Sequence, residues 1–164
     1  MKEMKKKRVM FVCHGNICRS PMAEFVLKDM AKRAGVADQM VIASSATSTE
    51  EIYGGVGNPM YPPARAELSA RGIAYTPRQA VQLRFSDYEK YDVFAVMDEA
   101  NYRNARRMLG GDPEGKVRKL MSYAGRSGDV ADPWYSRRFD VAYDDIYEGC
   151  VGLMRALFAW EDVK

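Results

Sequence analysis

Short apolar runs and longer stretches with helical spacing alternate along this chain. Residues 8–12 form an apolar run that ends at Cys13 and the turn-forming pair Gly15 and Asn16, as expected of a strand buried in a parallel sheet. Similar runs predict three further strands, at residues 40–43, 91–97 and 117–121.

Helical spacing of apolar residues begins directly after the first strand and its turn. Ser20 is suited to cap a helix and Pro21 to occupy its first position, and apolar residues recur at helical spacing from there to Gly35. Three more helices are predicted, at residues 63–71, 99–109 and 139–160. Between the second strand and the second helix, residues 44–63 form a polar, Gly- and Pro-rich loop, and loops of this length are often functional.

This alternation defines the expected fold class. Strands that alternate with helices favour right-handed crossovers, so we predict one α/β domain over residues 1–164, with a central four-stranded parallel sheet and helices on both faces. In such sheets a ligand binds beyond the carboxyl ends of the strands. Cys13 lies at one of these ends.

Composition narrows the class of protein without naming an activity. Lys and Arg total 25 against 22 Asp and Glu, and the bases are scattered apart from residues 5–8, which does not indicate a nucleic-acid-binding surface. No stretch approaches the roughly 20 apolar residues of a membrane span, and the basic start leads into a strand instead of a signal-peptide segment. We therefore expect a cytoplasmic protein that binds neither nucleic acid nor membrane.

The cysteines point to thiol chemistry. Cys13, Cys18 and Cys150 are an odd number in a chain without an export signal, which argues against a disulfide framework. A zinc site is equally disfavoured, because His14 is the only histidine and no second pair of closely spaced cysteines occurs. Cys150 lies inside the last predicted helix, where we expect a core residue.

Residues 13–20 carry the most specific chemical signal in the sequence. Cys13 and Arg19 are separated by five residues, between the end of a strand and the start of a helix. Such a segment can curl so that its backbone N–H groups point inward as an anion-binding nest, and Gly15 and Asn16 tolerate the positive φ that this requires. The helix N-terminus favours both a bound phosphate and the thiolate form of the cysteine. We predict a phosphate-binding loop with Cys13 as nucleophile.

Two further side chains of this loop have predicted roles. Arg19 can meet two phosphate oxygens through parallel hydrogen bonds, which the point charge of a lysine cannot reproduce. The Ser20 hydroxyl can donate to the Cys13 sulfur and help the thiolate to leave, or it can cap the following helix. The two roles of Ser20 are compatible.

A candidate proton donor lies much further along the chain. Phenolate, the base of an acid with a pKa of about 10, is a poor leaving group, so cleavage of an aryl phosphate benefits from a positioned acid. Asp132 precedes Pro133, Trp134 and Tyr135. An Asp-Pro pair is usually only a turn, but two neighbouring aromatic rings can form the walls of a slot for a phenyl ring. We predict that Asp132 is the general acid.

These residues resemble the low-molecular-weight protein tyrosine phosphatases, whose signature is similar to V-C-x-G-N-I-C-R-S-P near the N-terminus and D-P-aromatic near the C-terminus. Residues 12–21 match the first motif and residues 132–134 match the second. The resemblance extends over residues 59–72, Arg78 and Gln79, residues 92–98 and the final helix, which is nearly the whole chain. It implies the phosphotyrosine phosphatase I-like fold and hydrolysis of phosphotyrosine and other aryl phosphates.

The resemblance also implies roles for individual residues. Cys13 forms a phosphocysteine, Arg19 holds the phosphate, and Asp132 acts first as acid to the leaving group and then as base to the attacking water. Ser44 supports the loop through a side-chain network around Asn16. Substrate or phosphate contacts are assigned to His14, Gly15, Asn16, Ile17, Cys18, Ser20, Tyr53, Trp134 and Tyr135.

Two positions in the loop region have more than one interpretation. The resemblance implies that Cys18 can form a reversible disulfide with Cys13, and the alternative interpretation is a small buried apolar residue that fills space. His14 either tunes the thiolate and contacts substrate or points its side chain away from the nest, and we favour the second. Tyr75 falls near the place of a histidine that supports the loop asparagine in mammalian members.

Three alternative functions follow from other readings of the same loop. Protein-arginine phosphatases of the same family carry threonine where this loop has Ile17, and isoleucine suits an aryl ring better. Thiol-dependent arsenate reductases need resolving cysteines, which residues 80–110 lack. A silent phosphoprotein-binding module would be expected if Cys13 or Asp132 were replaced.

The expected partner is a tyrosine-phosphorylated protein, and the resemblance to bacterial members suggests a bacterial tyrosine kinase. No metal or organic cofactor is expected, because positioning and electrostatics suffice for this chemistry.

Overall fold

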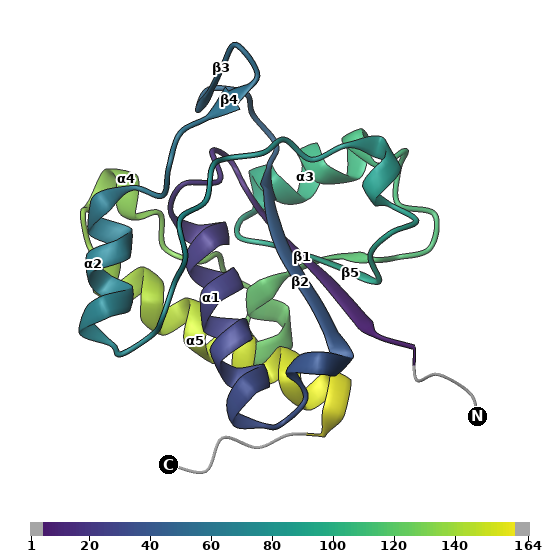
Figure 1. The fold of residues 1–164 in the computed structure, drawn as a ribbon. Coiled ribbons are helices and arrows are strands. Elements are labelled where there is room, and N and C mark those ends of the chain that lie inside the picture. The colour runs from purple at the N-terminus through teal and green to yellow at the C-terminus, as the bar shows by residue number, and fades with distance from the viewer. Residues whose placement is uncertain (1–4, 160–164) are drawn as a thin grey trace.

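A parallel sheet forms the centre of the computed structural model, which describes residues 5–159 (Figure 1). Its strands lie in the order β2-β1-β5-β6, and every neighbouring pair is parallel. These strands are β1 (Lys7–Cys13), β2 (Met40–Ala46), β5 (Val93–Val96) and β6 (Val117–Lys119). The predicted α/β class with four parallel strands is confirmed.

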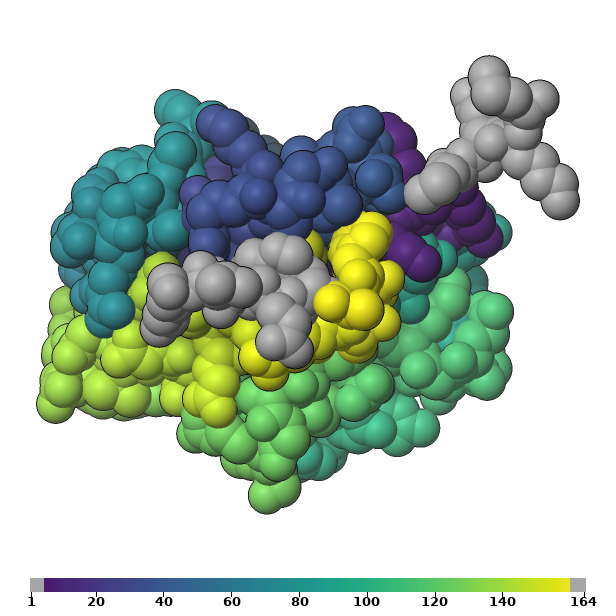
Figure 2. All heavy atoms as spheres, turned by 90° about the horizontal axis from the view of Figure 1, so that it is seen from below, coloured from purple at the N-terminus to yellow at the C-terminus, as the bar shows by residue number. Residues whose placement is uncertain are grey.

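Helices cover both faces of this sheet, as predicted. The helices α1 (Arg19–Arg33), α2 (Pro62–Ala70) and α5 (Phe139–Phe158) contribute to the core on one face, and α3 (Glu99–Met108) packs on the other. Successive side chains of β1 point to opposite faces of the sheet and so contribute to both cores. Val9 and Phe11 belong to the core under α1, α2 and α5, and Met10 and Val12 belong to the core under α3. Seen from below, the yellow end of α5 lies between blue residues that follow β1 and green residues near 120 (Figure 2).

The strand order positions the site. β1 lies between β2 and β5, and the helices that follow β1 and β5 pack on opposite faces of the sheet. A crevice therefore opens where the two crossovers diverge. Cys13 pairs with Ala46, and Val12 pairs with Val96, so the carboxyl ends of the three strands meet at this crevice.

Several boundaries differ from the sequence prediction. The long loop contains a short antiparallel hairpin of β3 (Ile52–Tyr53) and β4 (Val56–Gly57). The last strand is shorter than predicted, because the chain turns into a 3-10 helix, η3 (Leu120–Ala124), that packs on α5. The last helix ends at Phe158, and the end predicted at residue 160 lies outside the described residues.

Three further short helices complete the described part of the chain. They are η1 (Ala37–Gln39), η2 (Phe85–Asp87) and α4 (Pro133–Ser136), and hydrophobic periodicity cannot reveal elements this short. No helix within residues 5–159 has the length and apolar character needed to cross a membrane.

Candidate active site

The loop between β1 and α1 curls around the Cys13 thiol. Asn16 has a φ of 60° and is completely buried, so the left-handed conformation falls on the asparagine. Its backbone N–H donates to the Cys13 sulfur over 3.3 Å. Gly15 serves a different purpose, because a Cβ atom there would approach Glu51 Cγ to 3.2 Å.

Ser20 faces the thiol and does not cap the helix. The helix begins at Arg19, one residue earlier than Ser20, and the residue that precedes it forms no side-chain cap. The Ser20 hydroxyl is buried 3.0 Å from the Cys13 sulfur and accepts from the Asn16 amide over 2.7 Å. Because these contacts engage the hydroxyl, the prediction that Ser20 caps the helix is wrong. The Ser20 hydroxyl instead faces the Cys13 thiol.

A buried network supports the Asn16 side chain from one side. Its Nδ2 donates to Ser20 and also to Ser44 Oγ over 3.0 Å. Ser44 in turn donates to Glu24 Oε1 over 2.6 Å, and Lys28 donates to the other oxygen of that carboxylate. Ser44 thus lies where the sequence resemblance placed it, and Glu24 extends the network to the face of α1.

Arg78 supports the same asparagine from the other side. Its guanidinium donates to the Asn16 carbonyl over 2.9 Å and to Asn16 Oδ1 over 2.5 Å, while the Val81 N–H donates to that same oxygen over 3.0 Å. Burial lowers the pKa of Arg78, and the nearby Glu24 carboxylate opposes this. Tyr75 lies apart from the network, with its ring edge-on to Phe25.

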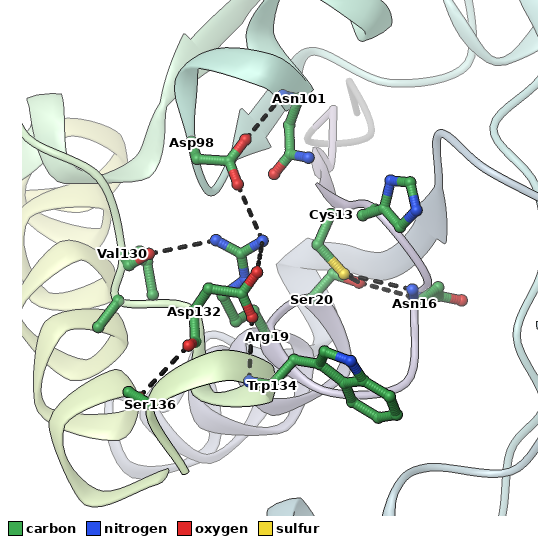
Figure 3. A network of polar contacts seen from close by, with 12 residues as sticks. Cys13, Asn16, Arg19, Ser20, Asp98, Asn101, Val130, Asp132, Trp134 and Ser136 are labelled. Carbon is green, nitrogen blue, oxygen red and sulfur yellow. Dashed lines mark hydrogen bonds and ion pairs between the residues drawn. The ribbon is translucent and has the colours of Figure 1, made fainter. Parts of the chain in front are cut away.

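Arg19 is almost fully buried and is held by two groups from later parts of the chain (Figure 3). Its Nη1 donates to the Val130 carbonyl over 3.1 Å, and its Nη2 donates to Asp98 Oδ2 over 2.9 Å. Asp132 Oδ2 lies 3.6 Å from the same nitrogen. Burial by itself would lower the pKa of Arg19, but the negative charges of Cys13 and the two carboxylates outweigh this effect and raise the pKa above its ordinary value. The guanidinium therefore stays charged.

Asp132 is the N-cap residue of α4. Its Oδ1 accepts from the Trp134 N–H over 3.1 Å, which fixes the carboxyl group and leaves Oδ2 beside Arg19. About a third of the side chain remains exposed. The carboxyl group therefore lies across the cavity from the loop, although almost 120 residues separate it from Cys13 in the sequence.

These groups line a cavity of about 460 Å³. Most of the sequence-predicted contact residues meet there, namely Cys13, His14, Gly15, Asn16, Ile17, Cys18, Arg19, Asp132, Trp134 and Tyr135. Trp134 and Tyr135 are partly or largely exposed at its mouth. Tyr53 lies on β3, is 68% exposed and is absent from this lining, so a contact with substrate stays a prediction for that residue.

The remaining predicted residues are His14, at the rim of the cavity, and the other two cysteines. His14 Nε2 lies 2.9 Å from Glu50 Oε2 at the exposed rim of the cavity. All three cysteines are free thiols. Burial raises the pKa of Cys18 to about 12, with a further contribution from the charge of Cys13, and burial alone raises the pKa of Cys150. Cys18 and Cys150 are therefore protonated at neutral pH.

Sequence reasoning assigned no role to three residues that hold this site together: Glu24, Arg78 and Asp98. Asp98 directly follows a predicted strand, and that position is a usable signal because the carboxyl ends of parallel strands share one edge. Arg78 lies in an irregular connection, where no periodicity marks it. Among the described residues, no cluster of three or more His, Cys, Asp or Glu side chains is arranged to bind a metal ion.

The fold and the site define a class of enzyme: an α/β phosphatase in which a phosphate-sized loop surrounds a cysteine thiol. The chain belongs to the low molecular weight phosphotyrosine protein phosphatase family, whose model matches residues 8–162. The sequence resemblance and the predicted enzyme class, a protein-tyrosine-phosphatase, are confirmed.

Individual relatives are similar over almost their full length. The chain is 32% identical to the low molecular weight protein-tyrosine-phosphatase YfkJ of Bacillus subtilis, with 91% of this chain and 94% of YfkJ covered. It is 36% identical to the low molecular weight phosphotyrosine protein phosphatase of Sus scrofa, over 95% and 96% of the two chains. The crystal structure of YfkJ superimposes with a TM-score of 0.87 at 30% identity, covering 93% of this chain and 95% of YfkJ.

Proposed function

We propose that this protein is cytoplasmic and hydrolyses phosphotyrosine in protein substrates through a phosphocysteine intermediate on Cys13. The observation that carries the proposal is the position of the Cys13 sulfur, which lies at the base of the cavity with Asn16 N–H at 3.3 Å and Ser20 Oγ at 3.0 Å. Both groups can donate to a thiolate and so stabilise its negative charge. Across the same cavity, Asp132 is available as a proton donor.

The proposed reaction has two steps. In the first step, the Cys13 thiolate attacks phosphorus, a P–S bond forms, the P–O bond to tyrosine breaks, and Asp132 gives its proton to the departing phenolate. In the second step, water attacks the phosphorus, Asp132 takes a proton from that water, and the P–S bond breaks to release inorganic phosphate. Ser20 stabilises the thiolate as it leaves, and Arg19 pairs with the phosphoryl oxygens in both transition states.

The residues at the mouth of the cavity support the proposal of an aryl substrate. Ile17, Trp134 and Tyr135 contribute apolar surface to the cavity lining, and a phenyl ring can pack between such groups. A tyrosine kinase that itself carries phosphotyrosine is one partner we propose, on the basis of the resemblance to bacterial members. We propose that residues 1–164 act as one phosphatase domain.

The test compares phosphotyrosine and phosphoarginine peptides in EDTA, with the wild type, Ile17→Thr and Cys13→Ser. We expect turnover of phosphotyrosine by the wild type, a weaker preference in Ile17→Thr, and phosphate binding without turnover in Cys13→Ser. If the wild type preferred phosphoarginine, the proposed substrate would be wrong, but the proposed roles of the loop residues would stand. Turnover by Cys13→Ser at the wild-type rate would refute the intermediate.

A further inference from the structure

One polar side chain of the cavity has no role in the reaction described above. Asn101 lies in the first turn of α3, is only 2% exposed and contributes to the cavity lining together with Cys13 and Arg19. Figure 3 shows its amide group between Asp98 and Cys13, with the nitrogen on the side of Cys13. Its side-chain oxygen is buried and has no hydrogen-bond partner.

A buried amide with an unpaired oxygen makes the fold less stable than an apolar side chain of similar size would. Turning the amide over does not remove the cost, because the nitrogen would then occupy the unpaired position. Leucine has the same branched arrangement of heavy atoms and leaves no polar atom unpaired. The amide is therefore better explained by a contact with a bound molecule than by packing, since unpaired buried polar groups in native structures frequently have a functional reason.

The backbone of Asn101 is fixed relative to Arg19 through one shared carboxylate. The Asn101 N–H donates to Asp98 Oδ1 over 2.8 Å, and Arg19 Nη2 donates to Asp98 Oδ2 over 2.9 Å. Arg19 and Asn101, which both line the cavity, are thus held at a fixed distance from each other by Asp98. The phosphoryl group that this cavity accepts is anionic, so the favourable orientation of the amide presents its N–H group to the cavity.

We propose that Asn101 is a substrate-contacting residue whose side-chain N–H donates to a phosphoryl oxygen, beside the bond from Arg19. This inference rests on the proposed phosphatase function for the identity of the bound group. It adds a donor from α3 to those of the loop, and it explains why the first turn of α3 carries a buried amide.

The test uses Asn101→Leu and Asn101→Asp, with Asn104→Leu as the matched control. Asn104 lies one turn further along α3, accepts from Arg107 and does not line the cavity. For Asn101→Leu we expect an unchanged or higher melting temperature, kcat/KM for a phosphotyrosine peptide lower by about 10- to 100-fold, and weaker competitive inhibition by inorganic phosphate. Asn101→Asp, which is isosteric but anionic, should lose more, and Asn104→Leu should match the wild type.

A structural role for Asn101 would give a different result. If Asn101→Leu lowered the melting temperature and left the inhibition constant of phosphate unchanged, the proposal would be overturned. The phosphate arm also separates this proposal from the proposed function, because the rise in melting temperature that inorganic phosphate produces is measurable without turnover. If the wild type failed to hydrolyse phosphotyrosine, a smaller rise in Asn101→Leu would support the contact and an equal rise would refute it.

Discussion

Replacing Asp132 by asparagine removes the acidic group and almost no volume. The asparagine oxygen can still accept from the Trp134 N–H, so the cap of α4 is retained. Arg19 keeps its bond to Asp98 over 2.9 Å, while its contact with Asp132 is longer, at 3.6 Å, and partly exposed. Arg19 is buried, but its charge stays paired with Asp98, and the contact with Asp132 is the longer of the two, so we expect Asp132→Asn to fold with nearly wild-type stability.

The loss of activity should be much larger than the loss of stability. A positioned general acid contributes about 10²- to 10⁴-fold, which corresponds to about 2.7–5.4 kcal/mol of transition-state stabilisation. The loss should depend on the leaving group, because a more acidic phenol departs without a proton. We therefore expect the full reduction with phenyl phosphate or phosphotyrosine and a smaller one with nitrophenyl phosphate.

The assay measures kcat/KM of the wild type and Asp132→Asn on phosphotyrosine and on nitrophenyl phosphate, and urea denaturation measures the stability of both proteins. Asp129→Asn is the matched control, because it removes a neighbouring carboxylate that pairs with Lys119 outside the cavity. An unchanged rate on phosphotyrosine would refute the acid assignment. An equal reduction on the two substrates would instead indicate that Asp132 acts on binding or on the loop.

Two further predictions concern the loop around Cys13. Arg78→Met removes two hydrogen bonds to the loop residue Asn16. We therefore expect the free energy of unfolding, measured in urea, to fall by about 1–3 kcal/mol and kcat/KM to fall as well. A loss of stability with full activity would contradict the supporting role of Arg78. Iodoacetamide at pH 7 should label Cys13 and spare Cys18, because the pKa of Cys18 is raised to about 12 and its thiolate is populated only near that pH. Peptide mass analysis decides the second prediction, and preferential labelling of Cys18 would contradict it.

Local patterns were sufficient for the fold class and for the chemical groups of the loop. The run that ends at Cys13 and the spacing to Arg19 are features of adjacent residues, and they predict strand, nest and helix without knowledge of distant contacts. The boundaries were less predictable where tertiary packing competes with local preference. Ser20 has the properties of a cap residue, yet the buried thiol and the Asn16 amide take its hydroxyl.

The sequence by itself determined the main helices and strands, the residues of the loop after the first strand and the identity of the acid candidate, because each of these features is encoded locally, in neighbouring residues. Only the tertiary structure decided which distant groups meet that loop. Arg78 and Ser44 reach Asn16 from segments that are 62 and 28 residues away, and Arg19 is oriented by Asp98, after β5, and by the Val130 carbonyl. The contacts of Ser44 and Asp98 arise from the parallel order of the strands, which brings carboxyl ends to one edge whatever their separation in the chain, whereas Arg78 comes from an irregular connection.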